Sequence, residues 1–322
     1  MKDLGGLRDA SRSLRRSKRA FSPLPYQTAP LPEFAPIDTP WYSSLWAHAV
    51  NSKHTRVTLG EFDVETELLP HLDGSLPQDE VHVWCVDLPA WEKEVESLLP
   101  LLNQEEQERA ARFKFPAPRN QFVISRALLR QVLGCYLRIG AREVQFRSAT
   151  NGKPELATAS GVHENLRFNL SHTAGAALIA VTQHRQVGID VERIRVDTNA
   201  MELAERFFSR PEVEWLRSQP AAEQIPAFFT CWTGKEAYIK ARGEGLSMPL
   251  SSFEVLPTAG TDECELQIKV YENPEEARRW FICQLALGTG LRAALVVEGE
   301  NCRVRLGQLT STDLNMNSRL AT

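Results

Sequence analysis

Hydrophobic and polar positions recur along this chain with two different periods. Apolar residues spaced three or four apart predict helices at residues 91–115, 120–137, 201–208, 211–218 and 228–242. Short apolar or alternating runs predict strands at residues 81–88, 143–149, 168–173, 176–183, 187–192, 251–256, 263–272, 279–287 and 292–299. These elements form two successive sets, so the pattern predicts an α+β fold with two halves of strand–helix–strand plan.

The helix expected at residues 228–242 carries the most informative side chains. Trp232, Glu236 and Lys240 lie at i, i+4 and i+8, so a ring, a carboxylate and an ammonium share one face. Apolar residues around the rest of the helix predict that most of it is buried. A buried Glu or Lys is costly unless it is paired, hydrogen-bonded or bound to a metal or phosphate. The alternative is an ordinary exposed Glu–Lys pair.

Two carboxylates close the strand expected at residues 187–192. Asp190 and Glu192 are two residues apart, and side chains at i and i+2 of a strand project to the same side. Such carboxylates repel unless one is protonated or a cation lies between them. Oxygen ligands of this kind suit Mg²⁺, which completes its shell with water and substrate phosphate. The alternative is a solvated strand end whose acids pair with Arg193 or Arg195.

Three further polar side chains stand in turns or near strand ends. Lys153 follows a tight Asn-Gly turn, and Ser171 and His172 lie near the end of the strand at residues 168–173. A hydroxyl, an imidazole and an ammonium can each donate a hydrogen bond to a phosphate. Taken singly, each also fits a surface turn or a structural strand end. No GxSxG turn surrounds Ser171, so nothing marks it as a hydrolase nucleophile.

Composition narrows the class of protein. With 322 residues, 43% of them hydrophobic and 24% charged, the chain is long enough for one large domain or two small ones. A net charge of −4 argues against a general nucleic-acid binder. The six cysteines form no CxxC pair, which favours reduced thiols in the cytoplasm. No apolar run is long enough to cross a bilayer, and no signal-peptide core follows the basic start.

The N-terminal region differs in composition from the rest. The first twenty residues carry seven basic side chains against two acidic ones, and six prolines follow between residues 21 and 40. This composition predicts an extended, partly disordered leader, with an organelle transit peptide as the alternative. Residues 41–78 have the aromatic and β-branched content of a hairpin that docks on the main body. The predicted divisions are an N-terminal extension (1–78), a first half (79–195), a second half (196–305) and a tail (306–322).

Four motifs follow one another in a specific order. They are NGKP at 151–154, FNLSHT at 168–173, GIDVE at 188–192 and WTGKEAYIKARGEG at 232–245. In this order they resemble the 4′-phosphopantetheinyl transferase superfamily, specifically its Sfp-type, single-chain members. The resemblance covers residues 80–300, including RFKF at 112–115 and SMPLSSFEV at 247–255, and leaves residues 1–78 unaccounted for.

The resemblance implies a role for each motif residue. The implied Mg²⁺ ligands, with Mn²⁺ as an alternative metal, are Asp190, Glu192 and Glu236. The implied catalytic residues are Glu236, as the base near the attacking hydroxyl, and Lys240, which meets the pyrophosphate of coenzyme A. The residues implied around coenzyme A all carry a positive charge or a donor group. They are Lys153, Ser171, His172, Lys235, Lys240 and Arg126.

Within that set, more than one arginine can be matched to the family's pattern. The local pattern SRALLR favours Arg126 for the 3′-phosphate, with Arg119 as a rival, and His172 is expected at the same phosphate. Trp232 matches the tryptophan of the family and is expected to support the site. Lys114 is only a weak match to the family's N-terminal lysines.

The resemblance also implies a fold, a reaction and partners. The fold is a pseudo-dimer of two similar α/β halves with mainly antiparallel sheets and the active site in the cleft between them. The reaction transfers the 4′-phosphopantetheine arm of coenzyme A to a serine of an apo acyl or peptidyl carrier protein and releases 3′,5′-ADP. Carriers of fatty-acid, polyketide or nonribosomal-peptide synthesis are all compatible, and the expected state is a cytoplasmic monomer without nucleic-acid or membrane partners.

Two other functions compete with this interpretation. One is a non-catalytic coenzyme A or nucleotide-binding protein with the same fold, and the other is a Mg²⁺-dependent nuclease or phosphatase. Retention of all three acids and of Lys240 argues against the first. The acidic charge balance argues against the second.

Overall fold

The computed structural model describes residues 55–59, 62–69, 72–149, 152–157, 165–258, 265–288, 290–299 and 302–310. These residues all belong to one unit of internal contacts, Thr39–Thr322. The leader predicted for residues 1–40 lies outside the described residues. The tail predicted for residues 306–322 begins too early, because Arg303–Gln308 form a strand that the apolar pattern did not predict, and the part of the tail beyond residue 310 is not described. Among the described residues, none of the helices combines the length and apolarity that spanning a bilayer requires.

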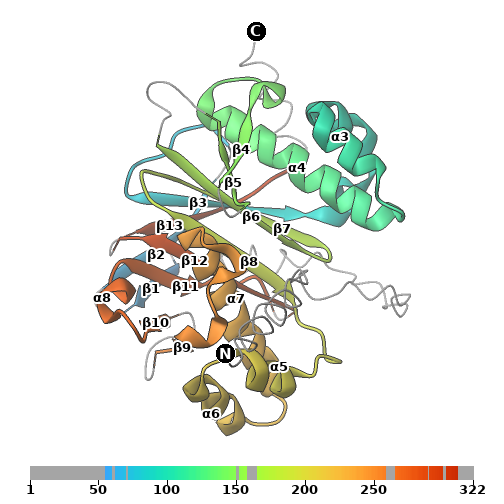
Figure 1. Ribbon diagram of the computed structural model, residues 1–322. Helices are drawn as coiled ribbons and strands as arrows, with labels where there is room; N and C mark the ends of the chain where they lie inside the picture. Colours follow the sequence, from blue (N-terminus) through green and yellow to red (C-terminus); the bar gives the residue numbers. More distant parts are fainter. Residues whose placement is uncertain are drawn as a thin grey trace, which may run out of the picture. The chain divides into compact units, whose positions relative to one another are not determined.

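The larger sheet has six strands in the order β1-β2-β13-β3-β7-β6 (Figure 1). Neighbouring strands are antiparallel, except that β13 pairs in parallel with both β2 and β3. The strands are β1 (Thr55–Leu59), β2 (Phe62–Leu69), β3 (Glu80–Asp87), β6 (Leu166–Thr173), β7 (Ala176–Gln183) and β13 (Arg303–Gln308). The hairpin expected before residue 78 is therefore confirmed as β1 and β2, and it joins the body through β13.

The second main sheet has three antiparallel strands in the order β11-β12-β8. They are β8 (Val187–Arg193), β11 (Trp280–Gln284) and β12 (Leu291–Glu298). Two short hairpins accompany the main sheets: β4 (Phe146–Ser148) with β5 (Pro154–Leu156), and β9 (Phe253–Pro257) with β10 (Leu266–Val270). The predicted division of the chain at residue 195 stays a prediction, although β8 pairs with β12 and β13 returns to the first sheet.

The α-helices follow the apolar periodicity with two exceptions, the region of residues 91–115 and the short helix at Pro274–Ala277, which was not predicted. They are α2 (Val95–Leu98), α3 (Gln104–Ala111), α4 (Pro116–Leu137), α5 (Ala200–Phe207), α6 (Arg210–Ser218), α7 (Gln224–Arg242) and α8 (Pro274–Ala277). The single helix expected at residues 91–115 is wrong. Pro100 lies in a 3₁₀ turn, and Asn103 then begins α3 anew with a capping box to Glu106.

The core forms layers between the two halves. One face of the six-stranded sheet packs against α4 through residues such as Trp84 and Leu128. Its other face packs against the three-stranded sheet through residues such as Val83 and Ile189. Helix α7 covers the far side of the second sheet, where Ala237 lies against Val296. The α+β prediction with two mainly antiparallel halves is confirmed, and each half carries one long helix on its outer face (Figure 1).

Candidate active site

Helix α7 lies directly against β8 because a glycine leaves room for it. A Cβ at Gly188 would lie 2.0 Å from the carbonyl oxygen of Ala237 and 2.3 Å from the amide nitrogen of Ala241. Only glycine fits so close an approach of two backbones. The helix ends at Gly243, whose φ of +68° suits a left-handed C-cap. This contact sets the last turn of α7, with Lys240, beside the acidic residues of β8.

Lys240 and Asp190 form the central ion pair of the site. Lys240 Nζ donates to Asp190 Oδ1 at 2.6 Å, to Ser171 Oγ at 3.1 Å and to the carbonyl oxygen of Ile189 at 3.2 Å. Ser171 Oγ donates to the same Asp190 Oδ1 at 2.9 Å. Asp190 Oδ2 is buried and has no hydrogen-bond partner among the described residues. One oxygen of this carboxylate is thus held by the protein, and the other remains for a ligand.

Glu192 and Glu236 lie within electrostatic reach of Asp190. Burial raises the pKa of Glu192 to about 7, with the negative charge of Asp190 as the next cause. Burial and Asp190, in that order, also raise the pKa of Glu236 to about 7. Thr173 Oγ1 donates to Glu192 Oε2 at 3.4 Å, whereas no described residue donates a hydrogen bond to Glu236. A cation at this point would relieve the repulsion of both glutamates.

The three carboxylates fit a divalent cation in their chemistry. Asp190 Oδ2 is an unpartnered buried oxygen, and oxygen ligands are what Mg²⁺ prefers. Within the described part of the chain, however, no group of three or more His, Cys, Asp or Glu side chains stands in a metal-holding arrangement. Here the Lys240 ammonium supplies the positive charge next to Asp190. Convergence of the three acids on one ion therefore stays a prediction that requires the glutamate side chains to move.

Side chains of β6, rather than another strand, meet one edge of β8. The opposite edge of β8 pairs with β12. Three β6 residues, each two positions from the next, carry polar side chains that face β8. Each accepts a hydrogen bond from a β8 amide: Asn169 Oδ1 from Ile189 at 2.9 Å, Ser171 Oγ from Val191 at 3.2 Å and Thr173 Oγ1 from Arg193 at 3.2 Å.

Ser171 is consequently committed to the protein. Its single hydroxyl hydrogen goes to Asp190, and its oxygen accepts from the Val191 amide and from Lys240 Nζ. A serine hydroxyl has one donor and two acceptor positions, so all are used. The predicted contact of Ser171 with a coenzyme A phosphate stays a prediction, and to donate to a phosphate the hydroxyl would have to give up its hydrogen bond to Asp190.

Lys153 joins three elements through backbone carbonyls. Its Nζ donates to the carbonyl oxygen of Val187 at 3.0 Å and to that of Lys240 at 2.7 Å. Desolvation lowers the pKa of Lys153 to about 8. The side chain thus ties the turn before β5 to the start of β8 and to the last turn of α7. Its predicted contact with coenzyme A stays a prediction, and at most one of its three donors is left for it.

His172 stands exposed near the end of β6, next to α4. Gln121 Nε2 lies 2.8 Å from His172 Nδ1. With the amide nitrogen as donor, Nδ1 accepts and the ring proton resides on Nε2, where it can meet a phosphate. Desolvation by surrounding protein atoms, followed by the charge of Lys240, lowers the pKa of His172. Gln121 was not predicted from the sequence, because a helical glutamine is an ordinary surface residue.

Lys235 was predicted to contact coenzyme A, and this prediction is wrong. The side chain is 0% exposed, and its Nζ lies 2.9 Å from Glu212 Oε2. It also donates to the carbonyl oxygens of Leu250 and Phe253 at 2.7 and 2.6 Å. Five residues along a helix correspond to a rotation of about 140°, so Lys235 and Lys240 point to different sides of α7. Sequence proximity to Lys240 was misleading for that reason.

Trp232 contributes to an aromatic cluster. Its ring stacks on Phe228 with centroids 5.7 Å apart and lies 6.2 Å from the ring of Phe208. The cluster belongs to the core that joins α5, α6 and the first half of α7. This geometry agrees with a supporting role for Trp232.

Arg126 is largely occupied by a carboxylate of α3. Arg126 and Arg130 both donate through Nε to Glu106, Arg130 at 2.7 Å. The Arg126 guanidinium also lies 4.2 Å from the centroid of the Phe146 ring. Hydrogen bonds from both arginines lower the pKa of Glu106, although burial, the largest single cause, acts in the opposite direction. Arg126 therefore braces α4 against α3 and the β4–β5 hairpin.

Arg119, the rival candidate, lies in the first turn of α4. It is two residues from Gln121, which contacts His172. Its Nη1 donates at 3.0 Å to Glu96, whose side chain is 76% exposed. An exposed ion pair of this kind is weak and can exchange for a ligand. The weaker ion pair of Arg119 favours it over Arg126, whereas its position does not, because side chains two residues apart on a helix do not share a face.

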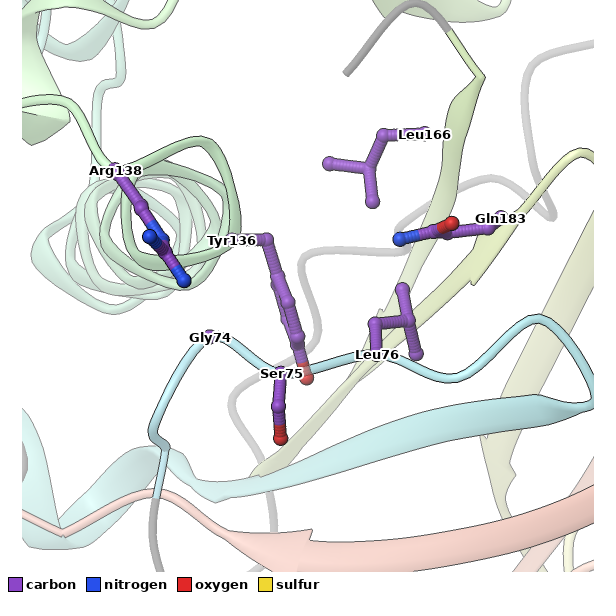
Figure 2. Close-up of a pocket in the computed structure, with 7 residues that line it drawn as sticks. All are labelled: Gly74, Ser75, Leu76, Tyr136, Arg138, Leu166 and Gln183. Atoms are coloured by element: carbon purple, nitrogen blue, oxygen red, sulfur yellow. The ribbon is translucent and has the colours of Figure 1, made fainter. Parts of the chain in front are cut away.

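A cavity of about 360 Å³ lies elsewhere in the first half. Figure 2 shows its lining, with Tyr136 and Arg138 of the α4 end facing Leu166 and Gln183 across the gap. The Tyr136 hydroxyl is held by Trp84 and a neighbouring histidine. None of the candidate site residues lines this cavity. The candidate active site therefore does not lie in this cavity.

The fold and the site together define the class. This is a two-half α+β enzyme whose charged groups gather where β6, β8 and α7 meet. The profile of the 4′-phosphopantetheinyl transferase superfamily matches residues 186–296, and that of the N-terminal part of 4′-phosphopantetheinyl transferases matches residues 89–184. Together with the relatives below, these matches show that the chain belongs to the 4′-phosphopantetheinyl transferase superfamily.

Individual relatives agree with this assignment. The chain is 38% identical over 225 residues to the 4′-phosphopantetheinyl transferase HetI of Nostoc sp., a match that covers 70% of this chain and 90% of that protein. It is 30% identical over 170 residues to the 4′-phosphopantetheinyl transferase Sfp of Bacillus subtilis, covering 53% of this chain and 73% of that one. A solved holo-(acyl-carrier-protein) synthase of Thermotoga maritima is 22% identical with a TM-score of 0.30, over 36% of this chain and 63% of that one, and the assignment does not rest on this likeness.

Proposed function

We propose that this enzyme transfers the 4′-phosphopantetheine arm of coenzyme A to a serine of an apo acyl or peptidyl carrier protein. The serine oxygen forms a new bond to the β-phosphorus, and the bond from that phosphorus to the bridging oxygen breaks. The products are the holo carrier and 3′,5′-ADP. The observation that supports this most is the Asp190–Lys240 ion pair where β8 meets α7, together with the buried Asp190 Oδ2, which has no hydrogen-bond partner among the described residues.

Glu236 is the proposed base for the carrier serine. It lies one helical turn before Lys240 on α7, and no described residue donates a hydrogen bond to its carboxylate. An unengaged carboxylate can accept the proton of an incoming hydroxyl. A positioned base of this kind contributes on the order of 10²–10⁴-fold to a rate.

Asp190, Glu192 and Glu236 are the proposed ligands of Mg²⁺, or of Mn²⁺ in its place. When bound, the ion would neutralise charge on the pyrophosphate. Lys240 then exchanges part of its interaction with Asp190 for the departing 3′,5′-ADP. Its side chain is 28% exposed, which leaves the ammonium accessible to a ligand.

His172 and Arg119 are the proposed partners of the 3′-phosphate. The Nε2–H of His172 and the guanidinium of Arg119 are both reachable from solvent. An arginine can hold a phosphate through two parallel hydrogen bonds. Arg126 is instead proposed to hold α4 against α3 through its contact with Glu106.

We further propose that the enzyme acts as a monomer in the cytoplasm, without nucleic-acid or membrane partners. Both halves of the site come from one chain, so a second copy is not needed to complete it. Light scattering of the purified protein at micromolar concentration tests the oligomeric state, and a mass of two chains would contradict the proposal.

Glu236→Gln tests the reaction itself. The variant keeps the size of the side chain but cannot accept a proton, so coenzyme A binding should persist while carrier modification falls by about 10²-fold or more. The readout is the mass gain of an apo carrier after incubation with coenzyme A and Mg²⁺. Glu223→Gln, at the exposed start of the same helix, is the matched control and should remain active.

Two outcomes would count against these assignments. Full transfer by Glu236→Gln would refute the role of that residue. Coenzyme A binding by the wild-type chain without transfer to any of a panel of apo carriers would favour a non-catalytic binding protein instead.

A further inference from the structure

The free edge of β8 is capped in a regular pattern. An edge strand leaves amide and carbonyl groups unpaired, and buried backbone groups of this kind require partners. The partners here are side chains at every second position of β6, matched to every second amide of β8 with a constant offset of twenty residues. The three pairs are Asn169 with Ile189, Ser171 with Val191, and Thr173 with Arg193.

Two carbonyl groups of the same strand are capped by lysines. Lys153 Nζ donates to the oxygen of Val187, and Lys240 Nζ donates to that of Ile189. Five backbone groups of β8 therefore depend on side chains that come from β6, α7 and the turn before β5. Some of the residues that were predicted to bind a ligand therefore form hydrogen bonds with the backbone of β8.

The capped strand is the one that carries the acids of the site. Asp190 and Glu192 alternate with the capped amides, so their directions follow from how β8 lies against β6. Among the described residues, Asn169 forms no hydrogen bond with either carboxylate, whereas Thr173 Oγ1 also donates to Glu192 Oε2 at 3.4 Å. Both side chains are buried, Asn169 at 6% and Thr173 at 9% exposure.

We propose that Asn169 and Thr173 are positioning residues for the transfer reaction. Together with Ser171 they fix the register of β8 against β6 and so direct Asp190 and Glu192 into the site. This inference rests on the proposed function for its catalytic consequence, but the capping itself does not depend on that function. The two parts can therefore be tested separately.

The capping is tested by amide hydrogen exchange followed by NMR on the full chain. Thr173→Val is isosteric and removes the acceptor, while Thr173→Ser keeps a hydroxyl and serves as the matched control. Exchange of the Arg193 amide should accelerate about fivefold to tenfold in Thr173→Val, as for the loss of one net hydrogen bond, and stay near the wild-type rate in Thr173→Ser. Asn169→Leu should do the same at the Ile189 amide.

The catalytic consequence is tested by kinetics with coenzyme A and an apo carrier. In Asn169→Leu and Thr173→Val we expect kcat to fall about tenfold while KM for coenzyme A changes less than about twofold, because the acids act on the reaction more than on ground-state binding. Thr173→Ser should restore kcat to within about twofold of wild type, which a merely destabilised fold would not predict.

Each result bears on one part of the inference. Unchanged exchange at Ile189 and Arg193 in the variants would overturn the capping. Faster exchange with unchanged kcat in both variants would overturn the positioning role. If the wild-type chain transfers nothing, the proposed function fails, and the exchange experiment still decides whether the side chains cap β8.

Discussion

The buried ion pair between Lys235 and Glu212 offers the sharpest test of how α7 is held. Both side chains are 0% exposed, with Nζ and Oε2 2.9 Å apart. Glu212 Oε2 also accepts from the Ser209 amide at 2.9 Å, and Oε1 accepts from the Val255 amide at 2.8 Å. One carboxylate therefore connects the start of α6, the middle of α7 and β9.

Replacing Lys235 by Met keeps the apolar stem and removes the charge. The Glu212 carboxylate then remains buried without its cation, which costs about 3–5 kcal/mol in comparable cases. The carbonyl oxygens of Leu250 and Phe253 also lose their common donor. Because the free energy of unfolding of an ordinary domain is only about 5–15 kcal/mol, Lys235→Met should be marginally folded at best.

Urea unfolding of a double-mutant cycle measures this effect. The cycle comprises Lys235→Met, Glu212→Gln and the double variant. We expect the double variant to lose about 1.5–3 kcal/mol less than the sum of the single losses, because removing both charges leaves neither one unpaired. Arg210→Met is the control: its pair with Glu214 lies on the same helix α6, the arginine side chain is 89% exposed, and its loss should change the free energy of unfolding far less than the loss of Lys235.

The same variant separates a structural role from a ligand-binding role. In whatever fraction is folded, Lys235→Met should bind coenzyme A with a Kd within about twofold of wild type, while Lys240→Met weakens binding about tenfold or more through loss of a charge-assisted contact. Strict additivity in the cycle, or a small stability loss combined with weaker coenzyme A binding by Lys235→Met, would refute the reasoning.

Three further predictions follow from single contacts. Gly188→Ala should lose at least about 3 kcal/mol in urea unfolding, because its Cβ overlaps α7, whereas Gly290→Ala, with no atom closer than 3.8 Å to its Cβ, should lose little. Desolvation lowers the pKa of Lys153 to about 8, so the folded state binds fewer protons than the unfolded state above that pH; wild type should gain stability relative to Lys153→Met as pH rises from 8 to 10, and parallel pH profiles of unfolding would contradict this. Arg119→Ala should raise KM for coenzyme A about tenfold but leave KM for a substrate without the 3′-phosphate unchanged, and Arg126→Ala should show no such selectivity.

Much of the fold was predictable because burial imposes periodicity. The helix containing Glu236 and Lys240, and the strand containing Asp190, stand where apolar spacing placed them. The break at Pro100 was missed because the apolar pattern continues through it, although the proline itself was a usable signal. Periodicity reports which face is buried and says less about where a helix is interrupted.

The candidate site was predictable in membership and less so in detail. Asp190 and Lys240 come together as expected from a family pattern. The hydrogen-bond partners of Ser171 and Lys153 depend on which edge of β8 is left unpaired. That edge follows from the order of strands in the sheet, which local sequence spacing does not encode. Alternating polar residues at 169, 171 and 173 were a readable sign that one face of β6 meets something polar.

The position of β13 has a consequence for synthesis of the protein. This strand comes from Arg303–Gln308, yet it lies between β2 and β3, which emerge from the ribosome more than two hundred residues earlier. Until residues 303–308 have been synthesised, the nascent chain exposes two unpaired strand edges, those of β2 and β3, to other chains. Loss of residues 303–308 therefore threatens the N-terminal half of the enzyme, although that half precedes them by more than two hundred residues.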